Sequence, residues 1–226
     1  MNHLLDNPVF NALISGDSHL GFGTEDVKFF EKEVSPFAGF RDEYKSGFDD
    51  LYQLLPGGRN VLYATRKKIT APRGWKIITV IEGTQFILDS KKTIGNRFIE
   101  PVPLESRHVD EMVRLAALTK PGPFDNRTIE FGNYFGIFEN ERLVAMTGQR
   151  LHVSDFTEVS AVCTHPQYVG KGYAGILLEH QLDLIIHNGQ HPFLHVRSDN
   201  DRAISIYERT GFKENGLMNF YFLKKL

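Results

Sequence analysis

The chain has 226 residues, of which 41% are hydrophobic and 24% charged, and its formal net charge is −2. This composition is typical of a soluble globular protein, and the length allows one large domain or two small ones. The small net charge and the lack of a basic block argue against a nucleic-acid-binding surface. No apolar run approaches the roughly 18 residues of a membrane span, so no membrane association is expected.

Cysteine usage and the first residues indicate the cellular compartment. Cys163 is the single cysteine, which excludes an internal disulfide framework. Residues 1–15 lack a cationic start followed by a continuous apolar segment, so a secretory signal is not expected. We therefore expect a cytoplasmic protein.

The first ninety residues show short helical patterns followed by strand patterns. Start signals and helical spacing of apolar side chains predict helices at 8–14, at 24–30 with Thr24 as its cap, and at 48–55. β-Branched runs predict strands at 61–65, 76–81 and 85–88, the last two separated by a turn at Gly83. The polar stretch 89–97 is expected to link two lobes.

After this stretch the pattern is a strand, a helix and then a series of strands. Strands are expected at 98–102, 134–138, 143–151, 157–164 and 193–197, and two more around Phe212 and at 219–223. Helices are expected from Ser106, after the glycines at 170–175 as far as His187, and at 200–209, where Gly211 ends the last helix. The mixture predicts an α+β fold.

A glycine-spaced turn between the strand at 157–164 and the following helix predicts an anion site. The first amides of a helix have no intrahelical acceptor, and the helix dipole adds partial positive charge there. Gly170 and Gly172 allow a bulky diphosphate to approach this backbone closely.

The turn also matches the dinucleotide fingerprint Gly-x-Gly-x-x-Gly, at Gly170, Gly172 and Gly175. That fingerprint normally lies on the first strand of a sheet with several further βα units. Only 51 residues follow Gly175, which is too few, so a nicotinamide or flavin site is disfavoured.

The same segment resembles the signature of the GNAT-type N-acetyltransferases, (Gln/Arg)-x-x-Gly-x-(Gly/Ala), at the start of a helix. In this register the signature runs from Val169 to Ala174, and Val169 stands where Gln or Arg is usual. In the family that position binds chiefly through its backbone. Val169 therefore weakens the sequence match to the signature more than it weakens the expected binding chemistry. The segments Val162–Pro166 and Asn200–Phe212 are similar to the family's strand end and last helix.

The resemblance covers roughly residues 98–226 and implies a mixed, twisted sheet flanked by helices, with an additional N-terminal α/β lobe. We expect the lobe to span residues 1–95 and the GNAT-like domain residues 96–226. The lobe resembles a degenerate copy of the fold, as in two-lobed glycine N-acyltransferases, and it could narrow the acceptor site or mediate a homodimer.

Acetyl-CoA is the implied co-substrate, and no metal is needed. The resemblance implies that two central parallel strands diverge to admit the pantetheine arm, and that backbone amides hold the diphosphate. The implied cofactor-binding residues are Val162, Cys163, Thr164, Val169, Gly170, Lys171, Gly172, Tyr173, Ala174, Gly175, Asn200 and Ala203.

Two residues are candidates for catalysis. Glu158 stands where GNAT histone acetyltransferases carry a catalytic glutamate, and strand alternation places residues 158, 160, 162 and 164 on one face. It is the candidate general base, and a solvated glutamate near a strand start is the alternative. Tyr207 shares one helix stripe with Asn200 and Ala203, and the family implies that its hydroxyl donates to the departing sulfur.

The expected function is direct transfer of an acetyl or other short acyl group from acyl-CoA to a primary amine in a ternary complex. A non-catalytic acyl-CoA sensor that reports occupancy to a partner is the alternative. The sequence does not identify the amine acceptor, which could be a small molecule, a peptide N-terminus or a lysine side chain.

Other chemically suggestive residues are expected to be structural. Cys163 lies on the strand face opposite Glu158 under strict alternation, and buried packing is expected for it. The histidines at 187, 191 and 195 are expected at the surface or as caps. Phenylalanines at 29, 30, 37, 40 and 48 are expected in a small lobe's core rather than in an acceptor pocket, and Arg66 to Lys68 at a solvated strand end.

Overall fold

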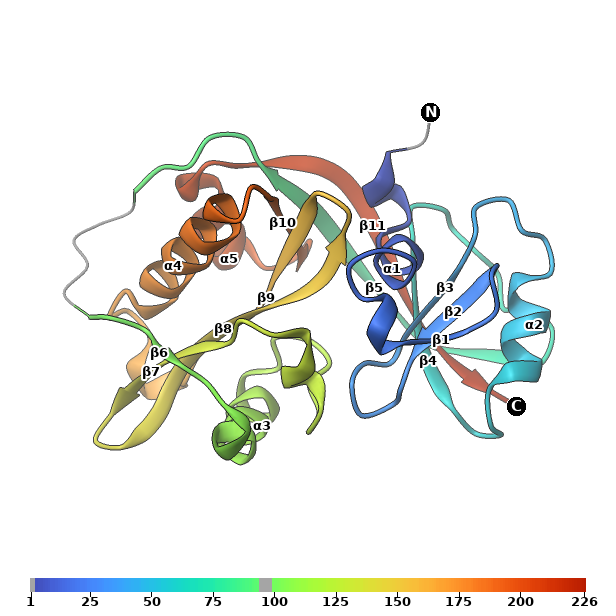
Figure 1. Ribbon diagram of the computed structural model, residues 1–226, viewed down its shortest axis with the longest axis horizontal. Coiled ribbons are helices and arrows are strands. Elements are labelled where there is room, and N and C mark those ends of the chain that lie inside the picture. Colours follow the sequence, from blue (N-terminus) through green and yellow to red (C-terminus); the bar gives the residue numbers. More distant parts are fainter. Residues whose placement is uncertain (1–2, 94–98) are drawn as a thin grey trace.

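The computed structural model describes residues 3–93 and 99–226 (Figure 1). Its helices are α1 (Pro8–Leu13), α2 (Gly47–Leu54), α3 (Val109–Thr119), α4 (Tyr173–His187) and α5 (Asp201–Thr210). Its strands are β1 (Gly21–Gly23), β2 (Val27–Phe30), β3 (Phe37–Phe40), β4 (Asn60–Thr65), β5 (Trp75–Leu88), β6 (Val102–Pro103), β7 (Phe135–Glu139), β8 (Arg142–Val153), β9 (Phe156–Thr164), β10 (His191–Arg197) and β11 (Phe212–Lys225). Among these residues no helix is long and apolar enough to cross a membrane.

The strands form one sheet in the order β1-β2-β3-β4-β11-β5-β10-β9-β8-β7-β6. Neighbouring strands run antiparallel except in two pairs, β3 with β4 and β9 with β10. A parallel pair needs a crossover, and helices α2 and α4 lie in these two connections. The mixed sheet with flanking helices confirms the expected α+β class.

The long strands β5 and β11 join the two halves of the sheet (Figure 1). β4 pairs with residues 219–224 of β11, whereas β10 pairs with residues 83–87 of β5. The expected domain boundary between residues 95 and 96 stays a prediction. Strands from both sides of this boundary belong to the same sheet, because β5 lies between β11 and β10. Part of the expected linker and the start of the strand expected at 98–102 lie outside the described residues.

The turn expected at Gly83 is wrong, because this glycine lies inside the continuous strand β5. A Cβ atom there would stand 2.8 Å from the Phe220 ring and 3.1 Å from the Val196 carbonyl oxygen. Gly83 is therefore explained by close packing between strands. The final two strands are likewise one strand, β11, with a bulge near Gly216, whose φ is +106°.

The helix expected after Thr24 is also wrong, because Val27–Phe30 forms strand β2. The Thr24 hydroxyl accepts a hydrogen bond from the Val27 amide at 3.1 Å, and the Thr24 amide donates to the Val27 carbonyl at 2.8 Å. These bonds close the β1–β2 hairpin. A threonine three residues before a hydrophobic run can stabilise a turn through its side chain as readily as it can cap a helix.

Helices cover both faces of the sheet and divide the core into layers. On one face, residues of α1 and α3 pack with Met146, Cys163 and Phe193. On the other face, residues of α4 and α5 pack with Val159 and Leu194. The expected aromatic core of the first lobe is confirmed, since Phe30 and Phe37 are at most 1% exposed.

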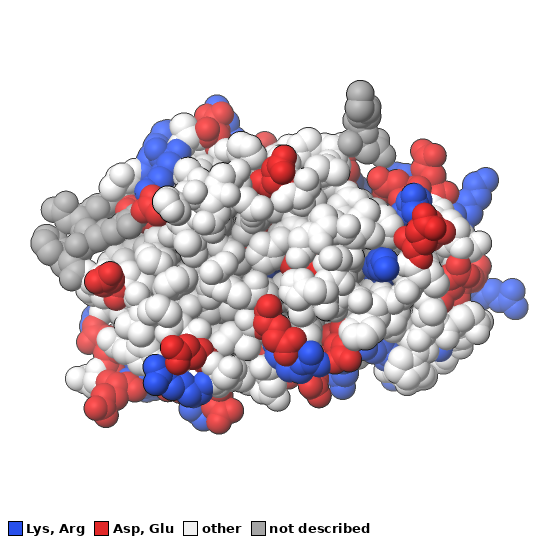
Figure 2. All heavy atoms as spheres, viewed as in Figure 1, with Lys and Arg blue, Asp and Glu red and all other residues white. Residues whose placement is uncertain are grey.

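One face of the molecule carries acidic and basic side chains mainly near its periphery. On the face shown in Figure 2 the lysines and arginines lie scattered among aspartates and glutamates around a mainly uncharged centre. This view agrees with the formal net charge of −2.

Candidate active site

The parallel strands β9 and β10 separate part-way along their length. They pair only from His191 with Phe156 to Phe193 with Glu158. Beyond this point the edge of β9 facing β10 has no strand partner over residues 159–164 within the part of the chain that the structure describes. A divergence of these two strands is what the sequence predicted.

A bulge at Ala161 changes which side chains of β9 share a face. Met146 pairs with Cys163 and Gly148 pairs with Ser160, so three steps on β9 match two on β8, and Ala161 has φ of +53°. The expectation that residues 158, 160, 162 and 164 share a face is therefore wrong. Cys163, rather than Val162, shares the side of Glu158 and Ser160.

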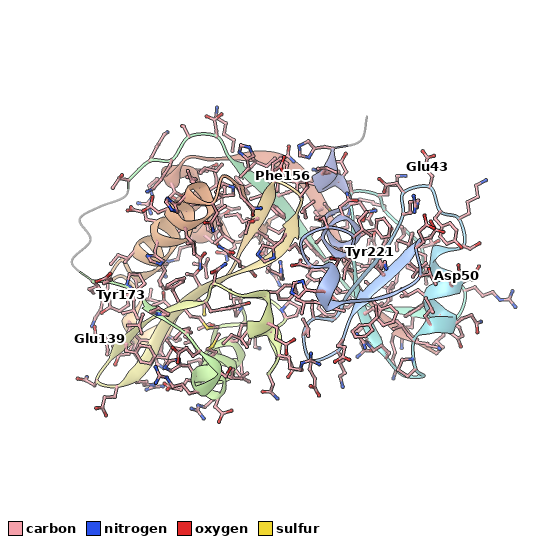
Figure 3. All side chains as sticks on the ribbon, in the orientation of Figure 1. Glu43, Asp50, Glu139, Phe156, Tyr173 and Tyr221 are labelled. Carbon is pink, nitrogen blue, oxygen red and sulfur yellow. The ribbon has the colours of Figure 1, made fainter. Side chains whose placement is uncertain are left out.

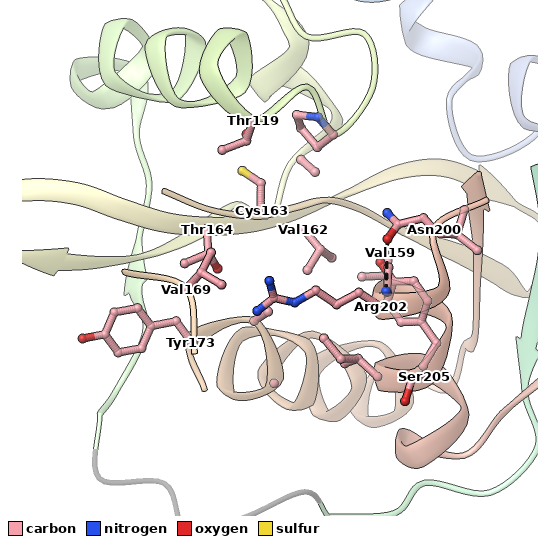
Figure 4. Close-up of a pocket in the computed structure, with 18 of the residues that line it drawn as sticks. Thr119, Val159, Val162, Cys163, Thr164, Val169, Tyr173, Asn200, Arg202 and Ser205 are labelled. Atoms are coloured by element: carbon pink, nitrogen blue, oxygen red, sulfur yellow. Dashed lines mark hydrogen bonds between the residues drawn. The ribbon is translucent and has the colours of Figure 1, made fainter. Parts of the chain in front are cut away.

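A cavity of about 850 Å³ opens where the two strands separate (Figure 4). Its walls are β9, β10, the start of α4 and one side of α5. All twelve predicted cofactor-binding residues line it, and so does Tyr207. The structure thus brings the predicted cradle, strand edge and last helix together, while ligand binding by these residues stays a prediction.

The glycine turn leaves the N-terminus of α4 open. Gly170 and Gly172 have φ of +93° and +84°, and Gly172 is the N-cap residue without a side-chain cap. A Cβ atom at Gly170, Gly172 or Gly175 would meet no other atom within 4 Å. Open space therefore lies beside the first turn of α4, whose amides lack intrahelical acceptors in any helix, as an anion site requires.

Glu139 on β7 holds the turn in place. Its carboxylate accepts a hydrogen bond from the Tyr173 hydroxyl and pairs with the Lys171 ammonium at 3.2 Å (Figure 3). These hydrogen bonds lower the pKa of Glu139 and raise the pKa of Lys171. Lys171 is thus engaged by Glu139 rather than available as a free cation.

Two polar groups in the cavity have no partner from the described residues. The Thr164 hydroxyl oxygen is buried and makes no hydrogen bond there. Arg202 extends from α5 across the cavity toward Val162 and Val169 (Figure 4). Sequence reasoning missed Arg202 because an arginine in the first turn of a helix carries no motif, and only the packing of α5 beside α4 shows its direction.

Tyr207 lies on the buried side of α5 and is 8% exposed. Burial first, and then the nearby Cys163, raise the pKa of its hydroxyl to about 12. The hydroxyl therefore stays protonated near neutral pH and can donate. Its predicted role as an acid is compatible with this position and stays a prediction.

Glu158 is fully buried and tightly paired. Arg150 donates from Nε to Oε2 at 2.8 Å and from Nη2 to Oε1 at 2.7 Å, and His195 Nδ1 lies 2.7 Å from Oε1. Burial alone would raise the pKa of Glu158, but Arg150 and His195 together hold it well below its usual value. Glu158 does not line the cavity, whereas Arg150 and His195 do. Its role as a base stays a prediction, and this pairing weighs against direct proton transfer.

His195 is buried, so the expectation of a surface or capping histidine is wrong. The Gln85 amide nitrogen donates to the Leu5 carbonyl oxygen and lies 2.9 Å from His195 Nε2. Arg66 and Asn215 donate to the amide oxygen of Gln85, which fixes the amide orientation. His195 Nε2 is then the acceptor, and Nδ1–H donates to Glu158.

The N-terminal lobe continues this polar network. Arg66 pairs with Asp6 as well as with Gln85, so the expectation of a solvated Arg66 is wrong. Phe37 on β3 places its ring 4.9 Å from the Arg150 guanidinium carbon. Residues from the first lobe therefore support the side chains that bind Glu158.

The expected burial of Cys163 is confirmed. The residue is 7% exposed, and its thiol points toward Thr119 (Figure 4). Burial raises its pKa to about 11, so the reactive thiolate form is scarce near neutral pH.

Comparison with known proteins agrees with this geometry. The FR47-like protein family model matches residues 134–222, the region that holds the cavity. A putative acetyltransferase from the GNAT family of Novosphingobium aromaticivorans is 30% identical, with a TM-score of 0.92 and full coverage of both chains. The chain belongs to the GNAT family of acetyltransferases. This membership supports acetyl transfer from acetyl-CoA in general terms and leaves the acceptor open.

Two more distant similarities concern part of the sequence and the fold. N-alpha-acetyltransferase RimI of Mycobacterium tuberculosis is 37% identical over 65 residues, which span 29% of this chain and 40% of that relative. A GCN5-related N-acetyltransferase from Kribbella flavida shares the fold, with a TM-score of 0.62, 12% identity and coverage of 97% of this chain and 95% of that chain.

Proposed function

We propose that this GNAT protein transfers an acetyl or other short acyl group from acyl-CoA directly to a primary amine in a ternary complex. One observation carries the proposal. A single cavity is lined by the unpaired edge of β9, the open N-terminus of α4 and the side chain of Tyr207. These are the three elements that a thioester carrier needs in order to be bound and to react.

Three features of the cavity support coenzyme A as its ligand. The unpaired backbone of β9 over 159–164 can pair with the amides of the pantetheine arm, as with another strand. The open amides of 170–175 and the Arg202 guanidinium would hold the diphosphate. The unpartnered Thr164 hydroxyl offers a further hydrogen bond at the turn.

The chemistry requires a free amine and a protonated leaving sulfur. Bound acyl-CoA supplies a thioester carbonyl, at which the new C–N bond forms while the C–S bond breaks. Tyr207 donates its hydroxyl proton to the sulfur and regains one from solvent, and the proton lost by the amine passes to water. An ammonium with pKa of about 10.4 must first lose its proton, which costs roughly 4 to 5 kcal/mol at pH 7.

Glu158 would serve as a base in direct contact with the amine only after releasing Arg150. Its bidentate pair and full burial support a positioning role, in which Glu158 orients Arg150 and His195 at the cavity wall. The amine would then bind in its unprotonated form or lose its proton to water.

The proposal is tested by measuring acetyl-CoA binding by calorimetry and product formation from a panel of amines by mass spectrometry. Micromolar or tighter binding together with an N-acetylated product is the expected result. Tight binding without any product over the panel would favour the sensor function. Absence of binding would contradict both functions.

A further inference from the structure

We propose that the amine accepted by this enzyme carries a carboxylate close to the amino group, and that the free edge of Arg150 binds this carboxylate. The proposal rests on the acyl transfer proposed above and names the class of its acceptor: small amino acids and similar amino carboxylates.

Arg150 has hydrogen-bond donors left after pairing with Glu158. A guanidinium presents five N–H donors, and Glu158 takes one from Nε and one from Nη2. The second N–H of Nη2 and both N–H groups of Nη1 are not used by Glu158, and they donate no hydrogen bond to another described residue. Together they form the end of the guanidinium fork, which matches the two oxygens of a carboxylate.

This free end of Arg150 lies at the cavity wall. Arg150 lines the cavity, its side chain is 12% exposed, and Nη1 lies 3.9 Å from the position that a Cβ atom of Gly122 would take. Gly122 follows Lys120 and Pro121, which also line the cavity. The free donors therefore face the space between β8 and the loop after α3.

Arg150 is also held rigidly. Glu158 binds one edge of the guanidinium and the Phe37 ring lies 4.9 Å from its central carbon. A donor pair fixed before the ligand arrives loses little freedom on binding. This arrangement gives the first lobe a part in acceptor recognition, because Phe37 belongs to β3.

The charges around the cavity favour an anionic group at this end. Lys171 is engaged by Glu139 and Arg197 by Asp199, while Arg202 and Arg209 belong to α5. Lys120, at the end of α3, and Arg150, on β8, are the remaining lysine and arginine residues of the described lining. Among the described lining residues Glu179 is the one carboxylate, and it already has an interaction partner. A polyamine or lysine-rich acceptor would find no acidic partner here.

The direct test compares acceptors that differ only in the carboxylate. Glycine and L-alanine are assayed against glycinamide and L-alaninamide by acetyl-CoA consumption, with the acetylated products identified by mass spectrometry. We expect kcat/KM to be at least about tenfold higher for the acids, mainly through a lower KM. Without carboxylate recognition the amides would react faster, because their less basic amino groups are more often unprotonated.

Two variants separate recognition from folding. Arg150→Lys keeps the positive charge beside Glu158 but removes the fork, and it should reduce the acid-to-amide ratio to one or below. Arg202→Gln, the control at the cofactor side, should raise the KM for acetyl-CoA and leave that ratio unchanged. If Arg150→Lys does not fold, Lys120→Ala replaces it, with a smaller reduction of the ratio expected.

Several results would overturn the proposal. These are equal or better use of the amides by the unmodified enzyme, an unchanged ratio in Arg150→Lys, or no product from any amino carboxylate despite acetyl-CoA binding. Failure to bind acetyl-CoA at all would instead refute the acyl transfer itself. The two failures are therefore distinguishable.

Discussion

Arg150 and Glu158 form a bidentate ion pair at the wall of the cavity, with N–O distances of 2.8 and 2.7 Å and a carboxylate that is fully buried. The pair determines what each residue can do. Glu158 is engaged by Arg150 and His195, and Arg150, which lines the cavity, keeps donors that Glu158 does not take. Replacement of either residue should therefore affect stability as well as activity.

Glu158→Gln should lower the free energy of unfolding by about 3 to 5 kcal/mol, because it leaves the buried Arg150 guanidinium without its counter-charge. Urea denaturation measures this loss. The exposed Glu214 provides a matched control, and Glu214→Gln should unfold within about 0.5 kcal/mol of the unmodified protein. Unchanged stability of Glu158→Gln, with loss of the acidic limb of the pH–rate profile, would support Glu158 as the base instead.

The stability of the fold should decrease in acid through the same pair. The folded-state pKa of Glu158 lies below its value in the unfolded chain, so the contribution is complete above the unfolded pKa of about 4.3 and is lost as pH falls toward the folded value. Denaturation measured from pH 6 down to pH 3 should show this loss. Glu158→Gln should flatten the slope, and equal slopes in both proteins would contradict the assignment.

Tyr207→Phe should reduce kcat by roughly 10- to 100-fold and leave the Kd of acetyl-CoA nearly unchanged, because only proton donation to the sulfur is removed. Steady-state kinetics and calorimetry measure the two quantities. Tyr63, a partly buried tyrosine whose pKa is also raised to about 12 by burial, lies in the first lobe and provides the control. Equal kcat in Tyr207→Phe and the unmodified enzyme would remove the assigned role.

Gly175→Leu should weaken acetyl-CoA binding by at least about tenfold, because its side chain would occupy the open space beside the helix amides. Gly175 lies within α4 and has no positive φ, so the change causes no backbone strain. Gly57→Leu, at another glycine with open space around it, is the control and should bind normally. Calorimetry that finds the same affinity in both variants would count against the cradle.

Local patterns predicted much of the cofactor side of the cavity. Gly170 and Gly172 have the positive φ that the turn requires, and Gly211 ends α5 as expected, while Asn200 caps the start of this helix. These features depend on residues close together in the sequence, where turn and cap preferences act directly.

The part of the cavity wall proposed to bind the acceptor depends on contacts between distant segments, and the sequence did not predict it. Arg150 and His195 come from β8 and β10, and Gln85 reaches His195 from β5. No spacing along the chain encodes such a network. The bulge at Ala161 was equally hidden, since an alanine with φ of +53° has no sequence signature, yet it changes which side chains face Glu158.

A crystal structure of the protein with acetyl-CoA would show whether the amides of 170–175 bind the diphosphate of an acyl-CoA. We expect diphosphate oxygens within hydrogen-bond distance of these amides, with the pantetheine arm along the unpaired edge of β9 and the sulfur near Tyr207. Acetyl-CoA bound elsewhere, or in the cavity with its diphosphate away from the N-terminus of α4, would contradict this expectation.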